Sequence, residues 1–303
     1  MDLRCLYPGE FAISESPVWC DRTGYLWWVS MVSPSAVFRL RWGETEPDVF
    51  PAPQPVTGLV LAEDDLPLVG STDRIFRLEV VSGDLVPVFA WPGLGNATRC
   101  NEMGVDPWGN LWVGTMTNNL VGAEIDPRAG TLVRIAADGS VETMRTGLGI
   151  PNTLVWADQG RSLLSADSLT GIIFRYRLDP DGRLAAAEKF HGPSGTGLPD
   201  GSALARDGNL WNARWSDGSV MALSREGAEL ERIPLAAGNV TSACFAGPNL
   251  DCLVVTTARW GLSPEDLAKQ PRAGAIMCVD GCGQGLPTRR FASPAANLSN
   301  IAI

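Results

Sequence analysis

The chain has 303 residues, of which 45% are hydrophobic, and a formal net charge of −10. No run of 18 apolar residues predicts a membrane helix, and the N-terminal "MDLRCLYPGEF" lacks the basic and then apolar layout of a signal peptide. The negative charge argues against the phosphate backbone of a nucleic acid as a partner. We therefore expect a cytoplasmic monomer or homodimer that acts on a small molecule, with neither nucleic acid nor membrane as a partner.

A short sequence motif, here called the phrase, repeats along the chain: an apolar strand, a turn such as Asp-x-Gly, and a second strand with Leu and often Trp. In chain order it reads "PVWCDRTGYLWWVS", "LVLAEDDLPLVGS", "GVDPWGNLWVGTM", "LVWADQGRSLLSADS", "SALARDGNLWNARW" and "ACFAGPNLDCLVVTTAR". The marker leucines of these copies are Leu26, Leu68, Leu111, Leu163, Leu210 and Leu253. Their spacing of roughly 42 to 52 residues is the period of four-stranded propeller blades.

Six copies predict an all-β, six-bladed β-propeller that forms a single domain over residues 1–303. A β-sandwich has no need of a fixed long period and is the weaker interpretation. After most copies, stretches such as "GIIFRYRLDPDGRL" supply a second hairpin with an Asp-Gly turn. Only residues 263–270, "SPEDLAKQ", predict a helix, with Ser263 as its N-cap and Pro264 in its first turn.

The seven cysteines are scattered, and they cannot form a zinc pattern with the single His of the chain. Reduced thiols are the simplest expectation for them. His191 lies in the loop "KFHGPSGTG", and no G-x-S-x-G motif accompanies it, which argues against a Ser-His-Asp hydrolase. The "GCGQG" segment (281–285) has no helical pattern after it, so a turn is favoured over a phosphate-binding loop.

Polar side chains stand at the start of several predicted innermost strands, which converge on the central channel of a propeller. These residues are Glu15, Asn101, Glu102, Asn152, Asp200, Thr241 and Ser242. An isolated Glu or a single Asn before a turn is more often structural, but several in the same blade position predict a shared pocket. Buried carboxylates at close range need a positive partner. Oxygen ligands favour calcium or magnesium over a structural zinc.

The same stretches resemble the family of senescence marker protein, gluconolactonase and luciferin-regenerating enzyme. The similarity runs through "SESPVWCDRTGYLWWV", "TRCNEMGVDPWGNLWVGTM", "GIPNTLVWADQGRSLLSADS", "GLPDGSALARDGNLWNARW", "VTSACFAGPNLDCLVVTTAR" and "QPRAGAIMCVDG", nearly end to end and in order. The resemblance implies one catalytic divalent metal in the channel, bound by Glu15, Asn152 and Asp200. Calcium is the first candidate, with magnesium, manganese, iron and zinc as alternatives. The resemblance also implies that Arg99, Asn101 and Glu102 bind the substrate.

This chain departs from the family pattern beside the metal ligands. Glu102 stands in place of the usual Asp, Met103 in place of Gly, and Thr153 in place of the Gly that follows the metal-binding Asn. After "GTM", where acidic residues are common, the chain has Thr117, Asn118 and Asn119. These departures change the size and polarity of the substrate wall, while the three metal ligands are kept.

The resemblance implies hydrolysis of a small, sugar-derived lactone, with the metal as a Lewis acid on its carbonyl and Arg99 as a planar clamp for the substrate. Asp200 is the implied general base, and water ionised beside the metal is the alternative nucleophile. Two other functions remain open at this point. One is a metal-dependent esterase or phosphotriesterase, as in diisopropyl-fluorophosphatase propellers, and the other is a non-catalytic, calcium-binding regulatory propeller.

Overall fold

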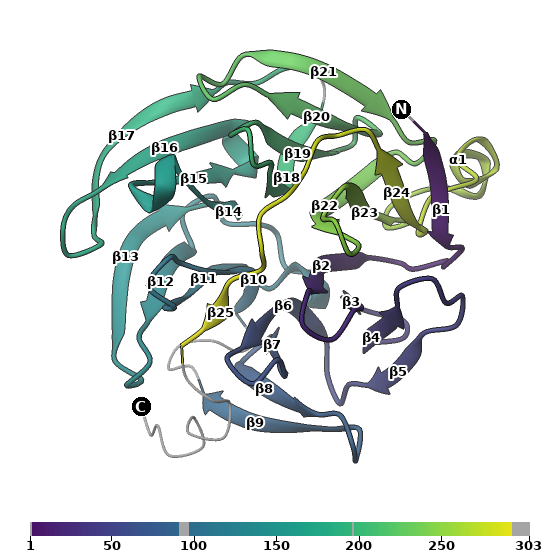
Figure 1. The fold of residues 1–303 in the computed structure, drawn as a ribbon, viewed down its shortest axis with the longest axis horizontal. Coiled ribbons are helices and arrows are strands. Elements are labelled where there is room, and N and C mark those ends of the chain that lie inside the picture. The colour runs from purple at the N-terminus through teal and green to yellow at the C-terminus, as the bar shows by residue number, and fades with distance from the viewer. Residues whose placement is uncertain (1, 91–96, 196, 293–303) are drawn as a thin grey trace.

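The structure is a computed structural model that describes residues 2–90, 97–195 and 197–292. Its strands form six sheets arranged around a central axis as the blades of a propeller (Figure 1). This arrangement confirms the predicted all-β, six-bladed fold. Within the described residues, no helix has the length and hydrophobicity needed to cross a lipid bilayer.

Blades 1 to 5 are each built from a consecutive stretch of chain, with the innermost strand first. Blade 1 contains β2 (Ser14–Cys20), β3 (Tyr25–Ser30), β4 (Ala36–Arg41) and β5 (Asp48–Pro51). Blade 2 contains β6 (Val56–Ala62), β7 (Pro67–Ser71), β8 (Arg74–Glu79) and β9 (Asp84–Ala90). Blade 3 contains β10 (Thr98–Val105), β11 (Leu111–Thr117), β12 (Gly130–Ile135) and β13 (Val141–Leu148).

Blade 4 contains β14 (Pro151–Ala157), β15 (Ser162–Asp167), β16 (Ile172–Leu178) and β17 (Leu184–His191). Blade 5 contains β18 (Leu198–Leu204), β19 (Leu210–Trp215), β20 (Ser219–Leu223) and β21 (Glu229–Pro234). Blade 6 contains β22 (Asn239–Ala246), β23 (Cys252–Ala258), β24 (Ile276–Asp280) and, as its outermost strand, β1 (Leu3–Tyr7). The N-terminal strand therefore closes the ring, with Leu3 opposite Val279 and Cys5 opposite Met277.

Burial falls from the inner strands of a blade to its outer edge. The six marker leucines each lie on the second strand of a blade and are at most 2% exposed. Strands β7, β11 and β23 are buried along their whole length, whereas outer strands such as β17 are largely exposed. The Leu and most of the Trp residues of the repeated phrase are thus buried in the core, where their apolar area is removed from water, whereas Trp108 in a turn is exposed.

All six innermost strands carry an irregularity in their pairing near the end at which they begin. The register shifts between Glu15 and Val18 in β2, between Asn152 and Val155 in β14, and between Pro199 and Ser202 in β18. Strands β6, β10 and β22 show the same feature. A β-bulge of this kind bends a strand and changes the direction of its side chains. The bulges lie beside the residues that the sequence predicts for the site.

Helices are short and lie outside the sheets. The 3₁₀-helices are η1 (Asn119–Val121), η2 (Asp158–Gly160) and η3 (Ser168–Thr170). Helix α1 (Pro264–Lys269) confirms the predicted helix: Ser263 is its N-cap, and it forms a reciprocal capping box with Asp266.

The end of the described chain crosses one mouth of the channel. Residues 281–292, here called the strap, run from blade 6 across the centre of the ring in yellow (Figure 1). They end in β25 (Arg290–Phe291), which pairs in parallel with the last residues of β6. The strap is anchored on the way by Gly285 N–H, which donates to Leu250 O, and by Thr288 Oγ1, which donates to Trp19 O. It covers the mouth at which the inner strands end.

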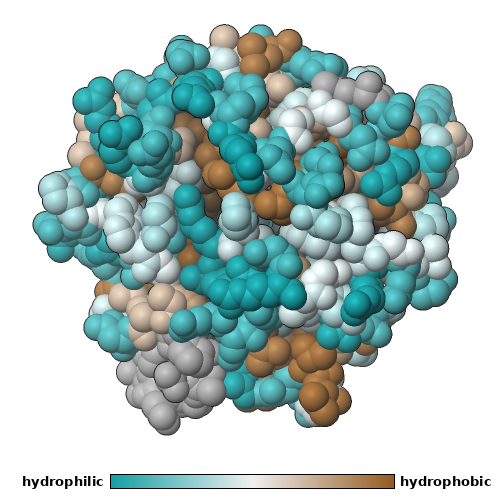
Figure 2. Space-filling model, viewed as in Figure 1, coloured by the Kyte–Doolittle hydropathy of each residue, from teal (hydrophilic) through white to brown (hydrophobic). Residues whose placement is uncertain are grey.

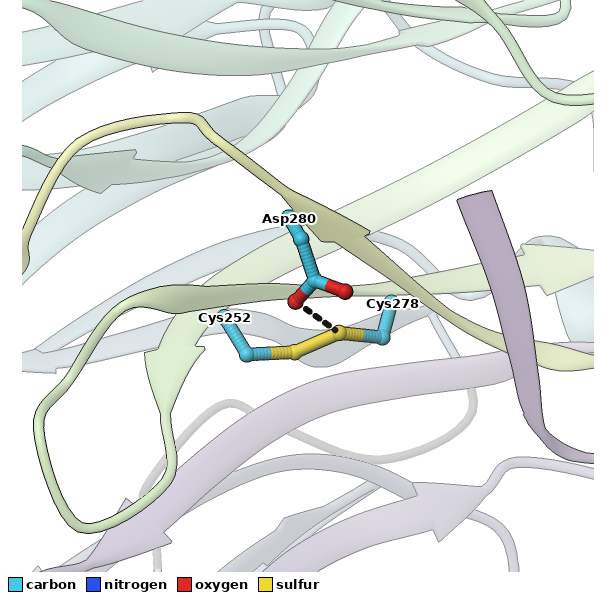
Figure 3. Close-up of side chains that lie close together, drawn as sticks. All are labelled: Cys252, Cys278 and Asp280. Carbon is cyan, nitrogen blue, oxygen red and sulfur yellow. Dashed lines mark hydrogen bonds between the residues drawn. A yellow bond between two sulfur atoms is a disulfide. The ribbon is translucent and has the colours of Figure 1, made fainter. Parts of the chain in front are cut away.

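One pair of cysteines corrects the expectation that all thiols are reduced. Cys252 on β23 and Cys278 on β24 are joined as a disulfide, with Asp280 beside them (Figure 3). These strands are neighbours in blade 6, so residues 26 positions apart come to a Cα–Cα distance of 6.1 Å. Asp280 accepts a hydrogen bond from Arg4 Nε at 3.3 Å. Sequence spacing alone did not reveal this pairing.

Candidate metal and substrate site

The structure brings the predicted site residues to the other mouth of the channel, where the inner strands begin. Glu15 lies on β2, Asn152 on β14 and Asp200 on β18, while Arg99, Asn101 and Glu102 lie on β10. Four of the six blades therefore contribute to this group. Asn101 Nδ2 donates to Asn152 Oδ1 at 3.0 Å, which connects the predicted substrate residues to the predicted metal ligands.

The amide of Asn152 is held in one orientation. Its Nδ2 donates to Ser168 Oγ at 2.9 Å, and Ser168 Oγ in turn donates to Pro199 O at 2.6 Å. The amide oxygen of Asn152 therefore faces Asn101 and not Ser168. A carbonyl oxygen has two lone pairs, so it keeps acceptor capacity beyond this hydrogen bond. Ser168 in η3 is not predicted from the sequence, because it stands at the far end of the repeated phrase and not at the start of an innermost strand.

Arg99 is buried and is fixed by amide oxygens. Its Nε and Nη2 donate to Asn119 Oδ1 at 3.1 and 3.0 Å, and its Nη1 donates to Asn101 Oδ1 at 2.8 Å and to Cys100 O at 2.9 Å. Asn119 was noted in the sequence only as a departure from an acidic pattern. In the structure its neutral oxygen orients the guanidinium without neutralising it, so the positive charge of Arg99 remains available to the carboxylates around it.

Thr153, the residue after Asn152, supports the backbone of Asp200. Its Oγ1 donates to Asp200 O at 2.5 Å and lies 2.9 Å from Ser202 Oγ, while Asn212 Nδ2 donates to the same carbonyl at 3.1 Å. Thr153 adopts a φ of 55°, a strained conformation for a β-branched residue. The hydroxyl thus accounts for a Thr where the family pattern has Gly, since Gly cannot make this hydrogen bond.

Blade 6 contributes backbone support and close packing. Thr241 Oγ1 donates to Ser14 O at 2.7 Å, so this hydroxyl ties β22 to the strand that carries Glu15. A Cβ added to Gly201, next to Asp200, would lie only 2.1 Å from Ser242 Oγ. Gly201 is therefore required by the close approach of β18 and β22 beside the site.

Burial and mutual repulsion make the three carboxyl groups hard to ionise. The pKa of Glu15 is raised to about 8, first by burial and then by Glu102. Burial also raises the pKa of Glu102 to about 7. The pKa of Asp200 lies well above its ordinary value, because of burial and then because of Glu15. Arg99 lowers the pKa of Glu15 and Asp200, but one cation cannot balance three carboxylates.

The donor set fits a hard divalent cation. Glu15 and Asp200 supply carboxylate oxygens, and Asn152 supplies an amide oxygen whose direction is set by Ser168. Hard cations such as Ca²⁺ and Mg²⁺ prefer oxygen ligands of this kind. Two positive charges added to that of Arg99 would balance Glu15, Glu102 and Asp200 in their ionised forms. The need of the buried carboxylates for a counter-charge is thus an independent reason to place a cation here.

Fold and site together define a six-bladed β-propeller with a buried cluster of carboxylates and amides at one mouth of its channel. Residues 13–259 match the family model of the SMP-30/gluconolactonase/LRE-like region. The chain belongs to this family, as its motifs predict.

Individual relatives are similar over nearly the whole chain. A pentonolactonase of Haloferax volcanii is 32% identical over 288 residues, which cover 92% of this chain and 94% of the relative. An L-arabinolactonase of Azospirillum brasilense is 31% identical over 286 residues, which cover 92% of both proteins. Among solved structures, a calcium-binding regucalcin from Agrobacterium tumefaciens aligns with a TM-score of 0.86 and 25% identity, covering 95% of this chain and 97% of its own.

Proposed function

We propose that this protein is a divalent-metal-dependent hydrolase that opens a small sugar lactone to the corresponding hydroxy acid. The observation that carries the proposal is the set of Glu15, Asn152 and Asp200 at one mouth of the channel, with the raised pKa values of both carboxyl groups and with the buried Arg99 beside them. Membership of the family and the similarity to a pentonolactonase and an L-arabinolactonase support the choice of a lactone as substrate.

In this proposal Glu15, Asn152 and Asp200 hold the cation, with calcium as the first candidate. When bound, a divalent cation acts as a Lewis acid that polarises a carbonyl and stabilises the negative charge that develops on its oxygen. Asp200 takes a proton from the attacking water. Thr153 and Asn212 hold its main-chain carbonyl, so the carboxylate projects from a fixed backbone.

The substrate wall is formed by Arg99, Asn101 and Glu102. Arg99 orients the substrate through its guanidinium, which Asn119 and Asn101 hold in place. Glu102 is kept in position by the backbone N–H groups of Met103 and Thr153, and its carboxyl group is available to accept a hydroxyl of the substrate. Asn101 and Asn119 add neutral amide groups beside the charged Arg99 and Glu102, and this mixture of donors and acceptors suits a polyhydroxylated sugar ring.

Two substitutions separate the ligand role from the base role of the carboxylates. Asp200→Asn keeps an oxygen for the cation but cannot take a proton at neutral pH. We expect this variant to retain the cation and to lose about 10²- to 10⁴-fold in kcat, which is the usual contribution of general base catalysis to the rate. Glu15→Gln changes a metal ligand that takes no part in proton transfer, so saturating metal should largely restore the activity of this variant.

Both variants are to be assayed on pentono- and hexonolactones by acid release at saturating divalent cation. Equal rescue of Asp200→Asn and Glu15→Gln would show that Asp200 is only a ligand. Lactone hydrolysis that is unchanged in both variants would contradict the proposed site.

A further inference from the structure

A cavity, here called the chamber, lies in the channel between the candidate site and the strap. Its volume is about 230 Å³. Every blade contributes one large apolar side chain of its innermost strand to the wall: Trp19, Leu61, Val105, Trp156, Leu204 and Phe245. The strap residues Leu286 to Arg289 complete the lining. Figure 2 shows this face of the molecule, which is hollowed beside the strap and has hydrophobic side chains in the hollow.

The cavity has one polar end. Ser16, Glu102 and Ser202 line it at the level of the candidate site, next to the bulges of their strands. From there the wall is mainly apolar until it reaches Arg289 on the strap. A ligand in this chamber therefore meets an acidic group at one end and a guanidinium at the other.

Arg289 is the unusual residue of the chamber. Its guanidinium carbon lies 5.9 Å from the centroid of the Trp156 ring, and the residue is partly buried. Within residues 2–90, 97–195 and 197–292 it forms no hydrogen bond or ion pair. By contrast, the next residue, Arg290, is paired with both Asp21 and Asp65. The strap is therefore anchored by Arg290 and does not need the charge of Arg289 for docking.

Burial lowers the pKa of Arg289, and the negative charge of Asp106 partly opposes this shift, but the two side chains form no ion pair. The carboxylate of Asp106 already accepts four hydrogen bonds from other groups. Asp106 accepts hydrogen bonds from Trp108 N, Asn110 N, Asn110 Nδ2 and Trp112 Nε1, all within 2.8–2.9 Å. A partly desolvated guanidinium without a partner is unfavourable, and a planar fork of donors matches a carboxylate. A carboxylate inside the cavity would therefore find in Arg289 a cation that the described residues do not already pair.

We propose that this chamber binds a small monocarboxylate with an apolar body. The carboxylate is held by Arg289, and the body packs against Trp156 and the apolar ring. The volume supports a body of about one aromatic ring, since an apolar cavity of about 150 Å³ is known to accept benzene. Arg289 on the strap fixes the direction of the ligand, with the apolar body towards the end lined by Glu102. This inference is independent of the proposed lactone hydrolysis.

Titration calorimetry with the full chain tests the chamber, with benzoate as the probe. Benzamide controls for the charge of the ligand and acetate for its apolar body. We expect one benzoate to bind per chain, and benzamide and acetate to bind about tenfold more weakly or worse. Binding should persist after the divalent cation has been removed by chelation, because the chamber lies apart from the cation ligands. Benzoate binding that requires the cation would place the ligand at the metal site and overturn the proposal.

Variants then locate the bound benzoate. Arg289→Gln should weaken binding by about 10- to 100-fold through the loss of a charge-assisted pair. Leu204→Phe narrows the chamber without changing its charge and should also weaken binding, whereas Arg183→Gln, on the exposed surface, should have no effect. Circular dichroism confirms that each variant is folded. Wild-type affinity in both Arg289→Gln and Leu204→Phe, equal binding of benzamide and benzoate, or no saturable binding by the wild type would refute the proposal.

Discussion

Residues of the candidate site differ in how far the sequence could predict them. Glu15, Asn152 and Asp200 are candidates because each stands just before a copy of the repeated phrase, and the family resemblance selects these three as metal ligands. They lie on strands that begin at one mouth of the channel. Ser168 and Asn119 could not be predicted, although they orient Asn152 and Arg99. Ser168 is the last residue of one repeated phrase and Asn119 follows another, both on short 3₁₀-helices, and only the three-dimensional path of the chain brings them to the site.

Thr153 combines a strained backbone conformation with a hydrogen bond to the backbone of Asp200. Thr153→Val keeps the β-branched shape but removes the hydroxyl that donates to Asp200 O. Because this leaves a buried hydrogen-bond group without one partner, we expect a loss of about 1–3 kcal/mol in the free energy of unfolding. We also expect weaker binding of divalent cations, since Asp200 is displaced.

Thr153→Ser is the matched control, because it keeps the hydroxyl and should keep both properties close to wild type. Urea unfolding and calorimetric titration with Ca²⁺ measure the two effects separately. If Thr153→Val bound the cation as tightly as the wild type, Thr153 would stabilise the fold without positioning Asp200.

At the scale of elements, the repeat predicted the blades but neither the bulges nor the strap. Bulges are set by the pairing register of neighbouring strands, which a single strand sequence does not display. The strap follows the last copy of the phrase and is not part of the repeat, so the repeat could not predict it. For the "GCGQG" segment at its start the sequence favours a turn over a phosphate-binding loop, and the structure shows bends and an isolated bridge at Gly285 without a helix there.

Arg290 is predicted to be the main anchor of the strap. Its side chain is 9% exposed and contacts Asp65 at 2.5 Å and Asp21 at 2.7 Å, which lie in turns of blades 2 and 1. Arg290→Ala removes the ion pair of Asp21 and leaves Asp65 with only the longer contact to Arg22 at 3.6 Å, and we expect a loss of about 1–3 kcal/mol in the free energy of unfolding. Chemical denaturation measures it.

The control for Arg290 is Arg183→Ala, which removes an exposed arginine paired with Glu142. Such a surface pair contributes about 0–1 kcal/mol. An Arg290→Ala variant no less stable than Arg183→Ala would mean that the strap is held by its backbone hydrogen bonds and apolar contacts instead.

For the whole molecule, the buried carboxyl groups predict a pH-dependent stability of the metal-free protein. Glu15 has a pKa of about 8 in the folded chain, against an ordinary value of 4.5. Between these values the folded state holds a proton that the unfolded state has released, so this group lowers stability progressively as the pH rises from about 4.5 to about 8. A bound divalent cation should remove this penalty.

Comparison with Glu15→Gln isolates this effect from all other titrating groups. After chelation, the variant should melt at a higher temperature than the wild type at pH 9, and the difference should shrink towards pH 5. Melting curves across this range, with and without Ca²⁺, supply the test. A difference that does not change with pH would show that Glu15 titrates normally.

The central claim is that a divalent cation held by Glu15, Asn152 and Asp200 enables this chain to hydrolyse a sugar lactone. The most direct measurement is acid release from a panel of pentono- and hexonolactones by the chelated protein, before and after Ca²⁺, Mg²⁺, Mn²⁺, Fe²⁺ or Zn²⁺ is restored. We predict that hydrolysis is lost on chelation and returns with at least one of these ions. Full activity of the metal-free protein, or no hydrolysis of any lactone with any of the ions, would contradict the account.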